Sequence, residues 1–255
     1  PYDLFDMTDG TGIYIFSDAL PMSSHYTVTP TKDDDHMNGV STFDLVLINK
    51  HILGLEPLNS PYKMIAADAN SSRSITTFDI VELRKLVLGL YDELPSNSSW
   101  RFVDKAYTFP NPTNPFQEVF PEIKSVANVQ ASQFADDFVS VKIGDVNGSV
   151  NPNFTSSDDR SAGTLFLDIA DRQVQAGELL TVEFNTPDEM AAYQLTLNFN
   201  GLELLDLLPG AKQTAENFGV FESEKTITVS VDSKAGFGLR FRAERSGMLS
   251  QLLGI

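Results

Sequence analysis

Side chains that carry oxygen recur at a fixed spacing within the twelve residues from Asp68 to Asp79. They occupy positions 1, 3, 5, 7, 9 and 12, which hold Asp68, Asn70, Ser72, Ser74, Thr76 and Asp79. Calcium takes six to eight oxygen ligands, and a twelve-residue loop with this spacing can place them around one ion. Position 6 holds Arg73 instead of the glycine that eases the turn, and position 12 holds aspartate instead of glutamate. We therefore predict a calcium site whose ligands are Asp68, Asn70, Ser72, Ser74 and Asp79.

The residues that close this loop occur twice in the chain, each time before a helix-like pattern. Thr42–Leu55 and Thr77–Leu90 are identical at eight of their fourteen positions. In both copies apolar residues recur three and four positions apart, which is the spacing of one face of an α-helix. Gly54 and Gly89 stand where a helix needs a left-handed residue to end. The duplication predicts two loop–helix units, each with an aspartate near the start of its helix.

The loop counted back from the aspartate of the earlier copy is less regular. Asp33 falls at position 1 and Asp35 at position 3, but Met37 at position 5 has no side-chain oxygen. We expect Asn38, or a backbone carbonyl, to supply the missing ligand. A second calcium site is therefore predicted at Asp33, Asp35, Asn38 and Asp44.

A third fragment, Asp145-Val146-Asn147-Gly148, resembles the opening of such a loop, although no helix follows it. Two interpretations stay open: Asp145 and Asn147 bind a third calcium ion, or the fragment is a plain Asn-Gly turn. It lies in a segment, 95–160, that is rich in proline, asparagine and serine and is expected to be irregular. The sequons at Asn97 and Asn153 in this segment are candidate glycosylation sites.

Composition narrows the classes of function. The chain has 255 residues with 35 acidic and 18 basic side chains, a formal net charge of −17 and no cysteine. This balance argues against binding to nucleic acid, which needs clustered lysine and arginine, and the lack of cysteine excludes disulfides and thiol chemistry. No apolar run is long enough for a transmembrane helix, so no membrane insertion is expected. No leader sequence is visible in the first residues.

No nucleophile, phosphate-binding or dinucleotide-binding motif stands out in the sequence. The adjacent aspartates Asp136-Asp137 and Asp158-Asp159 are the nearest approach to a catalytic carboxylate pair. Neighbouring aspartates in polar segments are more often solvated or bound to a metal. The protein is therefore not expected to be an enzyme.

Both ends of the chain show the alternation of β-strands. Leu180, Val182 and Phe184 would face one way, and the pattern recurs in 193–199, 227–231 and 239–243. Period-two alternation between turn residues predicts antiparallel strands with one buried face. Shorter apolar or alternating runs lie within the first 32 residues, and Gly12–Phe16 is one of them. We expect a mainly β protein with a small α module, in which two β-sandwich segments are joined by the paired loop–helix unit.

The paired loop–helix units resemble a type I dockerin, whose repeats read D-x-N-x-D-G followed by an aliphatic residue and a helix-starting aspartate. The C-terminal part, with Ala176-Gly177-Glu178, Tyr193–Leu197 and Ala215–Phe221, is similar to a cohesin-like β-sandwich. Residues 1–32 resemble the last strands of an Ig-like domain of the Cna-B or carboxypeptidase-regulatory kind. These resemblances imply the following parts: 1–32, C-terminal Ig-like strands; 33–94, a dockerin-like calcium-binding repeat; 95–160, an irregular segment with the third candidate loop; and 161–255, an apparently incomplete cohesin-like sandwich.

The dockerin resemblance also marks helix positions that dockerins use for partner contact. They hold Thr42, Phe43, Asn49, Lys50, Thr76, Thr77, Arg84 and Lys85. A spacer role within the chain is at least as well supported as docking on a separate partner. The order of modules resembles large secreted surface proteins of Gram-negative bacteria, which implies an extracellular or cell-surface location.

The expected function is that of a structural or adhesive building block of a bacterial surface fibre, stabilised by calcium. Its partners would be copies of itself, joined by strand complementation, or neighbouring modules of the same protein. The alternative is a non-catalytic carbohydrate-binding or scaffolding region of a secreted enzyme that degrades polysaccharide, with polysaccharide as the partner.

Overall fold

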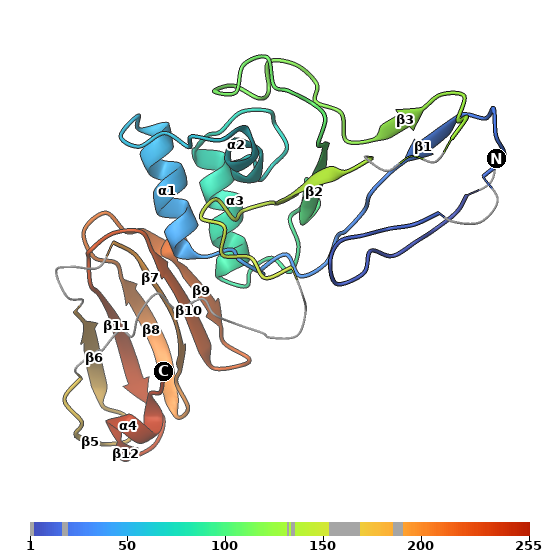
Figure 1. The fold of residues 1–255 in the computed structure, drawn as a ribbon. Coiled ribbons are helices and arrows are strands. Elements are labelled where there is room, and N and C mark those ends of the chain that lie inside the picture. Colours follow the sequence, from blue (N-terminus) through green and yellow to red (C-terminus); the bar gives the residue numbers. More distant parts are fainter. Residues whose placement is uncertain (1–2, 17–19, 132, 134–135, 153–168, 186–190) are drawn as a thin grey trace.

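A computed structural model describes residues 3–16, 20–131, 133, 136–152, 169–185 and 191–255. Within these ranges the chain is mainly β, with a few short helices and several small antiparallel sheets. The coarse prediction of a mainly β protein with some helix is thereby confirmed. Figure 1 shows three parts: an N-terminal arm (the described residues of 3–31), a helical unit (those of 32–152) and a C-terminal β unit (those of 169–255).

The helices are α1 (Thr42–Ile52), α2 (Pro61–Ala67), α3 (Thr77–Val87) and α4 (Leu249–Leu252), with a 3-10 helix at Ala215–Asn217. The strands are β1 (Tyr26–Val28), β2 (Trp100–Asp104), β3 (Lys124–Val126), β4 (Phe138–Lys142), β5 (Gln173–Val174), β6 (Leu179–Phe184), β7 (Tyr193–Asn198), β8 (Leu202–Leu208), β9 (Phe218–Phe221), β10 (Thr226–Val231), β11 (Phe237–Ala243) and β12 (Gly247–Met248). Three two-stranded ladders, β1-β3, β2-β4 and β12-β5, accompany two three-stranded sheets, β7-β10-β9 and β6-β11-β8.

Helices α1 and α3 begin and end in the same way, as the duplicated sequence predicts. Near each start Asp44 or Asp79 accepts a hydrogen bond from the backbone N–H of the cap residue three positions earlier. At each end a glycine takes a positive φ, +67° at Gly54 and +71° at Gly89, and the backbone folds back on the last turn. Only glycine adopts this conformation without strain, which is why the helices stop there. The two predicted helices and their glycine stops are confirmed.

The helical unit has one core, to which both helices and strands contribute. Its buried residues include Val40, Leu45, Ile48, Ile65, Leu83, Leu86, Val103, Ile143 and Val146. Val103 comes from β2 and Ile143 follows β4, so the β2-β4 ladder closes the core around α1, α2 and α3. The described part of the segment expected to be irregular, 95–160, therefore contains strands and belongs to the same folded unit as the helices.

The C-terminal β unit encloses a second core between its two three-stranded sheets. In β6 exposed and buried residues alternate, with Leu180, Val182 and Phe184 buried as the sequence pattern predicts. Phe184 stacks on Phe237 of β11 with 4.5 Å between the ring centroids. Helix α4 lies at one end of this core and contributes Leu249 and Leu252, so the unit is closed there by a helical turn.

The two sheets of the β unit differ in the chemistry of their outer faces. On β6-β11-β8 charged pairs join neighbouring strands, such as Arg240 with Asp206 at 2.9 Å. On β7-β10-β9 the central outward residues are uncharged: Gln194, Thr228 and Ser230. Ser230 is fully buried, because the start of α1 lies against it, with the hydroxyls of Thr42 and Ser230 2.9 Å apart; Figure 1 shows the helices at this end of the sheet.

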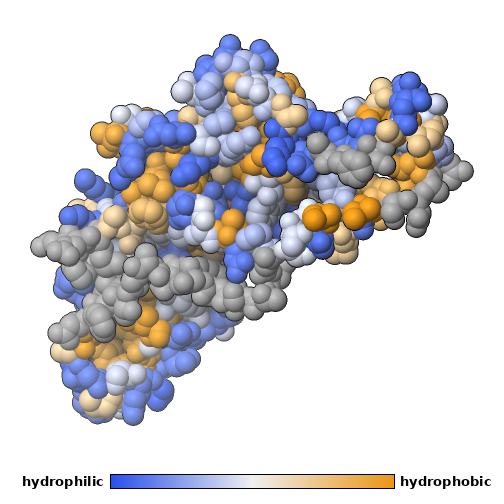
Figure 2. All heavy atoms as spheres, viewed as in Figure 1, coloured by the Kyte–Doolittle hydropathy of each residue, from blue (hydrophilic) through white to orange (hydrophobic). Residues whose placement is uncertain are grey.

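The N-terminal arm contains little regular structure. Its strand β1 pairs with β3 from Tyr26↔Val126 to Val28↔Lys124. The run Gly12–Phe16, which the sequence favours as a strand, makes no ladder. The large apolar side chains that the arm exposes are Leu4, Phe5, Met7, Ile13, Ile15 and Met22, and Figure 2 shows hydrophobic surface along the arm.

Candidate calcium sites

The loop from Asp68 to Asp79, between α2 and α3, brings its first and last carboxylates together in the interior. Both side chains are fully buried. Asp68 Oδ1 accepts the backbone N–H of Ser72 at 2.8 Å, and its Oδ2 accepts that of Arg73 at 2.9 Å. Asp79 Oδ1 accepts the backbone N–H of Asn70 at 3.2 Å. The backbone is therefore wrapped around the two carboxylates, and we call residues 68–79 the contiguous loop.

A second pair of carboxylates comes from two segments that are distant in the sequence. Asp44 lies near the start of α1 and Asp145 follows β4, and both are buried. Asp44 Oδ1 accepts the backbone N–H of Asn147 at 3.1 Å. Asp145 Oδ1 accepts the N–H of Ser149 at 3.1 Å, and its Oδ2 accepts that of Val150 at 2.9 Å. No helix follows Asp145 directly in the sequence; α1, which comes much earlier in the chain, takes that place in the fold.

The two clusters have the same hydrogen bonds at equivalent positions. The residue at position 3 donates its backbone N–H to the closing carboxylate, from Asn70 to Asp79 in one cluster and from Asn147 to Asp44 in the other. The residues at positions 5 and 6 donate theirs to the two oxygens of the first carboxylate in both. Chain connectivity does not explain this agreement, because only one of the loops is continuous.

In the second cluster one segment ends at position 6 of the loop and the other segment begins at position 7. In the contiguous loop Ser72 Oγ donates to the carbonyl of Ser74, which is position 7, at 3.2 Å. In the second cluster Ser149 Oγ donates to the carbonyl of Gly39 at 3.0 Å. Residues 145–150 thus supply positions 1–6 and residues 39–44 supply positions 7–12. We call these twelve residues the split loop.

The loop predicted from Asp33 to Asp44 is not the loop that forms. Asp33 Oδ1 accepts the backbone N–H of Ser99 at 2.7 Å and lies 3.1 Å from Nε2 of His36. Asp35 is exposed. Among the described residues no hydrogen bond joins Asp44 to Asp33 or Asp35. Asp33 and Asp34 are engaged by other partners, Asp34 by Lys32 at 3.0 Å, and residues 145–150 contact Asp44 in place of 33–35.

Asn38, predicted as a ligand, joins the two segments just beside the split loop. Its Nδ2 donates to the carbonyl of Asn151 at 2.8 Å, and its Oδ1 accepts the N–H of Asn151 at 3.2 Å. Both functional groups of the amide are therefore engaged by the neighbouring segment. Asn38 therefore joins the two segments beside the point where one half of the loop ends and the other half begins.

Burial sets the electrostatics of both loops. It raises the pKa of Asp44 to about 6; hydrogen bonds from Ser41 act against this, and the like charge of Asp145 adds to it. Burial also raises the pKa of Asp68, and the charge of Asp79 again adds to the effect. None of these four carboxylates forms a salt bridge within the part of the chain that the structure describes. A cation between the two carboxylates of a loop would relieve both costs.

The donor set suits a hard cation. Within the described residues no group of three or more His, Cys, Asp or Glu side chains converges on one point. Each loop instead combines two carboxylates with neutral oxygens: Asn70, Ser72 and Ser74 in the contiguous loop, and Asn147 and Ser149 with the Gly39 carbonyl in the split loop. Calcium accepts such mixed oxygen ligands, whereas zinc prefers imidazole and thiolate.

We expect calcium to stabilise the protein more at about pH 7.5 than at about pH 5. The pKa of Asp44 is about 6 in the fold, above its ordinary value of 3.8. Between these values the calcium-free native state holds a proton that the unfolded chain has lost, so its stability falls as pH rises through this window. Calcium bound between the two carboxylates would compete with that proton and offset the loss above pH 6. Thermal melts with and without calcium at the two pH values check this; equal shifts at both would contradict it.

The start of α1 and the end of α3 contact the β unit. Thr42 donates both its backbone N–H and its hydroxyl to Gln194 Oε1, each at 3.1 Å, and its hydroxyl lies 2.9 Å from that of Ser230. Arg84 Nη2 lies 3.0 Å from Asp232 Oδ2. Two of the positions that the dockerin resemblance assigns to partner contact, Thr42 and Arg84, thus contact the chain's own β unit.

The remaining candidate residues are placed as follows. Asn97 donates its side-chain amide to the backbone carbonyl of Asp68 at 2.9 Å, so it supports the contiguous loop. Asn153, the second candidate for glycosylation, and Asp158-Asp159 lie outside the described residues. Asp137 is exposed and lies 3.1 Å from Lys105, which is the arrangement of an ordinary surface ion pair.

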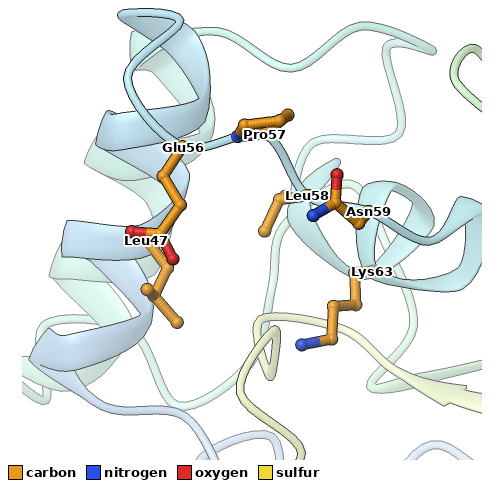
Figure 3. A pocket seen from close by; sticks show the side chains of 6 residues that line it. All are labelled: Leu47, Glu56, Pro57, Leu58, Asn59 and Lys63. Carbon is orange, nitrogen blue, oxygen red and sulfur yellow. The ribbon is translucent and has the colours of Figure 1, made fainter.

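A pocket of about 240 Å³ lies between α1, the loop after it and α2. Figure 3 shows the residues that line it: Leu47, Glu56, Pro57, Leu58, Asn59 and Lys63. It is smaller than most small-molecule sites, which range from about 300 to 1,000 Å³. Glu56 is paired with Lys50 at 2.8 Å. The lining has no histidine and no hydroxyl or thiol nucleophile.

The residues that the sequence interpretation missed are Gly39, Ser149 and Val150. The signal for Ser149 was present, because oxygen-bearing side chains recur at 145, 147, 149 and 151 with the same spacing as at 68, 70, 72 and 74. No described helix is long and apolar enough to cross a membrane. No protein-family model matches the sequence, and no curated protein or solved structure matches it significantly.

Proposed function

We propose that the protein is a calcium-binding structural protein in which one ion in the contiguous loop and one in the split loop hold the helical unit together. The observation that carries the proposal is a single hydrogen-bond pattern repeated around two buried carboxylate pairs, one in a continuous loop and one made from two segments. Two like charges buried together destabilise a fold unless a cation neutralises them. The ligands would be Asp68, Asn70, Ser72, Ser74 and Asp79 in one loop and Asp145, Asn147, Ser149, Gly39 (carbonyl) and Asp44 in the other.

The two ions would do different mechanical work. In the contiguous loop the ion fastens the start of α3 to the end of α2. In the split loop it fastens the start of α1 to the chain after β4, and so closes a long stretch of chain into a ring. An ion bound only by the folded state stabilises it by mass action, by about 2.7 kcal/mol at a hundred times the dissociation constant.

Removing calcium is expected to lower the melting temperature by several degrees, because each degree reflects a small fraction of a kcal/mol in a domain of this size. Elemental analysis and titration calorimetry should find one ion per loop. Asp79→Ala should lose the ion of the contiguous loop, and Asp145→Ala that of the split loop. Magnesium is the control, since it prefers a smaller octahedral shell and should shift the melt less. An unchanged melt after chelation, with no metal found, would overturn the proposal.

The finer architecture belongs to the same proposal. The helical unit would be a dockerin-like module with one permuted loop, the β unit a cohesin-like sandwich, and the arm the last strands of an Ig-like domain. Support comes from the paired loops, from the two sheets around one core, and from contacts at Thr42 and Arg84, positions that the resemblance marks for a partner. Such a protein would act at the bacterial cell surface, where calcium is abundant and where cysteine-free modules need another means of stabilisation.

We further assign the protein a structural or adhesive role rather than a catalytic one. The support is the N-terminal arm, whose exposed residues Phe5 and Met7 are 95% and 90% accessible. Apolar side chains so exposed mark a surface that another molecule covers, and the self-association expected for a fibre subunit would cover it. Electron microscopy of the calcium-loaded protein should show fibres that Phe5→Asp disrupts. Monodisperse monomers that bind sugars on a glycan array would favour the carbohydrate-binding alternative instead.

A further inference from the structure

The helical unit holds the β unit at two separate points. One is the start of α1, where Thr42 contacts Gln194 and Ser230. The other is the end of α3, where the carbonyl of Leu88 accepts the hydroxyl of Thr228 at 2.6 Å and the Arg84–Asp232 ion pair forms. Two separated points of attachment restrict the orientation between rigid bodies far more than one point, which allows rotation in every direction about it.

The first point is part of the split loop. Thr42 occupies position 10 of the loop, between Ser41 and the closing ligand Asp44. Asp44 Oδ2 accepts the backbone N–H of Ser41 at 3.0 Å and its hydroxyl at 2.7 Å. The same carboxylate therefore closes the loop and fixes the backbone that presents Thr42 to the β unit. Thr42 itself is 2% exposed, so a change in this backbone cannot leave its contacts intact.

The contiguous loop has no such connection. The equivalents of Thr42 and Phe43 there are Thr77 and Phe78, and both are exposed, Phe78 to 72%. Helix α3 contacts the β unit with its other end, through Arg84 and Leu88. Loss of order at the contiguous loop would therefore leave both points of attachment in place.

We propose that calcium in the split loop, and not in the contiguous loop, sets the orientation of the β unit on the helical unit. With the ion bound, the β unit is held at α1 and at α3. Without it the half-loop at 39–44 separates from 145–150, the contacts of Thr42 are lost, and the β unit pivots about the end of α3. The inference rests on the proposed calcium binding and adds to it that one ion controls a junction between units.

Distances between spin labels test the inference in the full chain. Because the sequence has no cysteine, Lys63→Cys on α2 and Thr181→Cys on β6 give two unique attachment sites, and both residues are exposed. Pulsed electron resonance should show a narrow distance distribution with calcium and a distinctly broader one after chelation. Asp145→Asn should stay broad in calcium, whereas the matched variant Asp68→Asn should stay narrow.

The outcomes separate this inference from the proposed function. If calorimetry shows that the ions leave on chelation but the distribution keeps its width, calcium binds without controlling the junction and the inference is wrong. If Asp68→Asn broadens the distribution as much as Asp145→Asn does, the assignment to the split loop is wrong. If no calcium binds at all, the proposed function fails first.

A variant on the β unit tests the same coupling from the other side, without changing either loop. Coupling between two binding events is reciprocal, so loss of the contact must weaken the ion by the same factor with which the ion strengthens the contact. Gln194→Ala should lower calcium affinity at the split loop by about fivefold or more and leave the contiguous loop unchanged. Thr196→Ala, exposed on the same strand, is the control and should change neither affinity. Equal affinities in all three proteins would refute the coupling.

Discussion

Replacing Gly39 by alanine should lower the free energy of unfolding by about 3 kcal/mol or more and remove calcium from the split loop. Gly39 has a φ of +77°, and a Cβ there would lie 2.7 Å from Cα and Cβ of Val150. Real Cβ atoms do not approach backbone so closely, so the two halves of the loop would have to move apart. Urea unfolding followed by circular dichroism, with and without calcium, measures both effects.

Gly54→Ala is the matched control for this experiment. Gly54 also has a positive φ, +67°, but a Cβ there would meet no atom within 4 Å. It should therefore cost only the backbone strain of a left-handed alanine, about 1 kcal/mol, and leave calcium binding unchanged. Equal losses in the two variants would show that strain alone, and not the junction of two segments, explains the effect at Gly39.

The second large effect is expected at Asp44→Ala. The side chain of Asp44 is fully buried and accepts four hydrogen bonds, from Ser41 N and Oγ, Val146 N and Asn147 N. Its loss leaves the buried N–H of Val146 and the part-buried donors of Ser41 and Asn147 without their acceptor and removes the closing ligand, so we expect a loss on the order of 4 kcal/mol in the presence of calcium. Titration calorimetry should then find one ion fewer per chain.

Asp35→Asn distinguishes the split loop from the loop counted back along the sequence. Asp35 is exposed and has a φ of +42°, a conformation that asparagine tolerates. The variant should keep both ions. Its free energy of unfolding should stay within about 0.5 kcal/mol of the wild-type value, so its melting temperature should hardly change. If Asp35→Asn releases an ion while Asp145→Asn does not, residues 33–44 form the first calcium loop and the split loop does not bind.

The contiguous loop and the two helices could be predicted because everything that specifies them is local. Asp68 and Asp79 stand a loop length apart, and the capping aspartates and the stops at Gly54 and Gly89 lie within a few residues of the helices they bound. The split loop could not be predicted in this way because its halves occur in reversed order along the chain. A count of twelve positions needs a continuous segment, and residues 39–44 come before 145–150.

Counting back from Asp44 assigned the acidic run before α1 to the loop, and the fold gives a physical reason why this was wrong. Asp33 and Asp35 lie at the correct distance from Asp44, but distance along the chain does not show which donors compete for a carboxylate. In the fold Asp33 is engaged by the N–H of Ser99 and by His36. Ser99 is a tertiary neighbour of Asp33, and no local sequence pattern predicts these contacts.

The strands divide in the same manner. Alternation in 179–184 and 237–243 was sufficient because both segments bury one face in a core formed by nearby residues. The run Gly12–Phe16 has a comparable local preference but no neighbouring strand within the described residues. A strand exists only through its pairing, so local sequence could not decide whether this one forms.

The place at which the split loop joins its two halves also determines how the molecule would carry tension. Asn38 and Gly39 lie beside Val150 and Asn151, where the two segments of the split loop meet. A pull applied at these two points would load the hydrogen bonds between residues 39–44 and 145–150, whereas α2, α3 and the contiguous loop lie outside the path of the force. An ion bound in the split loop would strengthen this junction against the pull. Chelation should therefore lower the force that ruptures the split loop far more than it lowers the force that unfolds the rest of the helical unit.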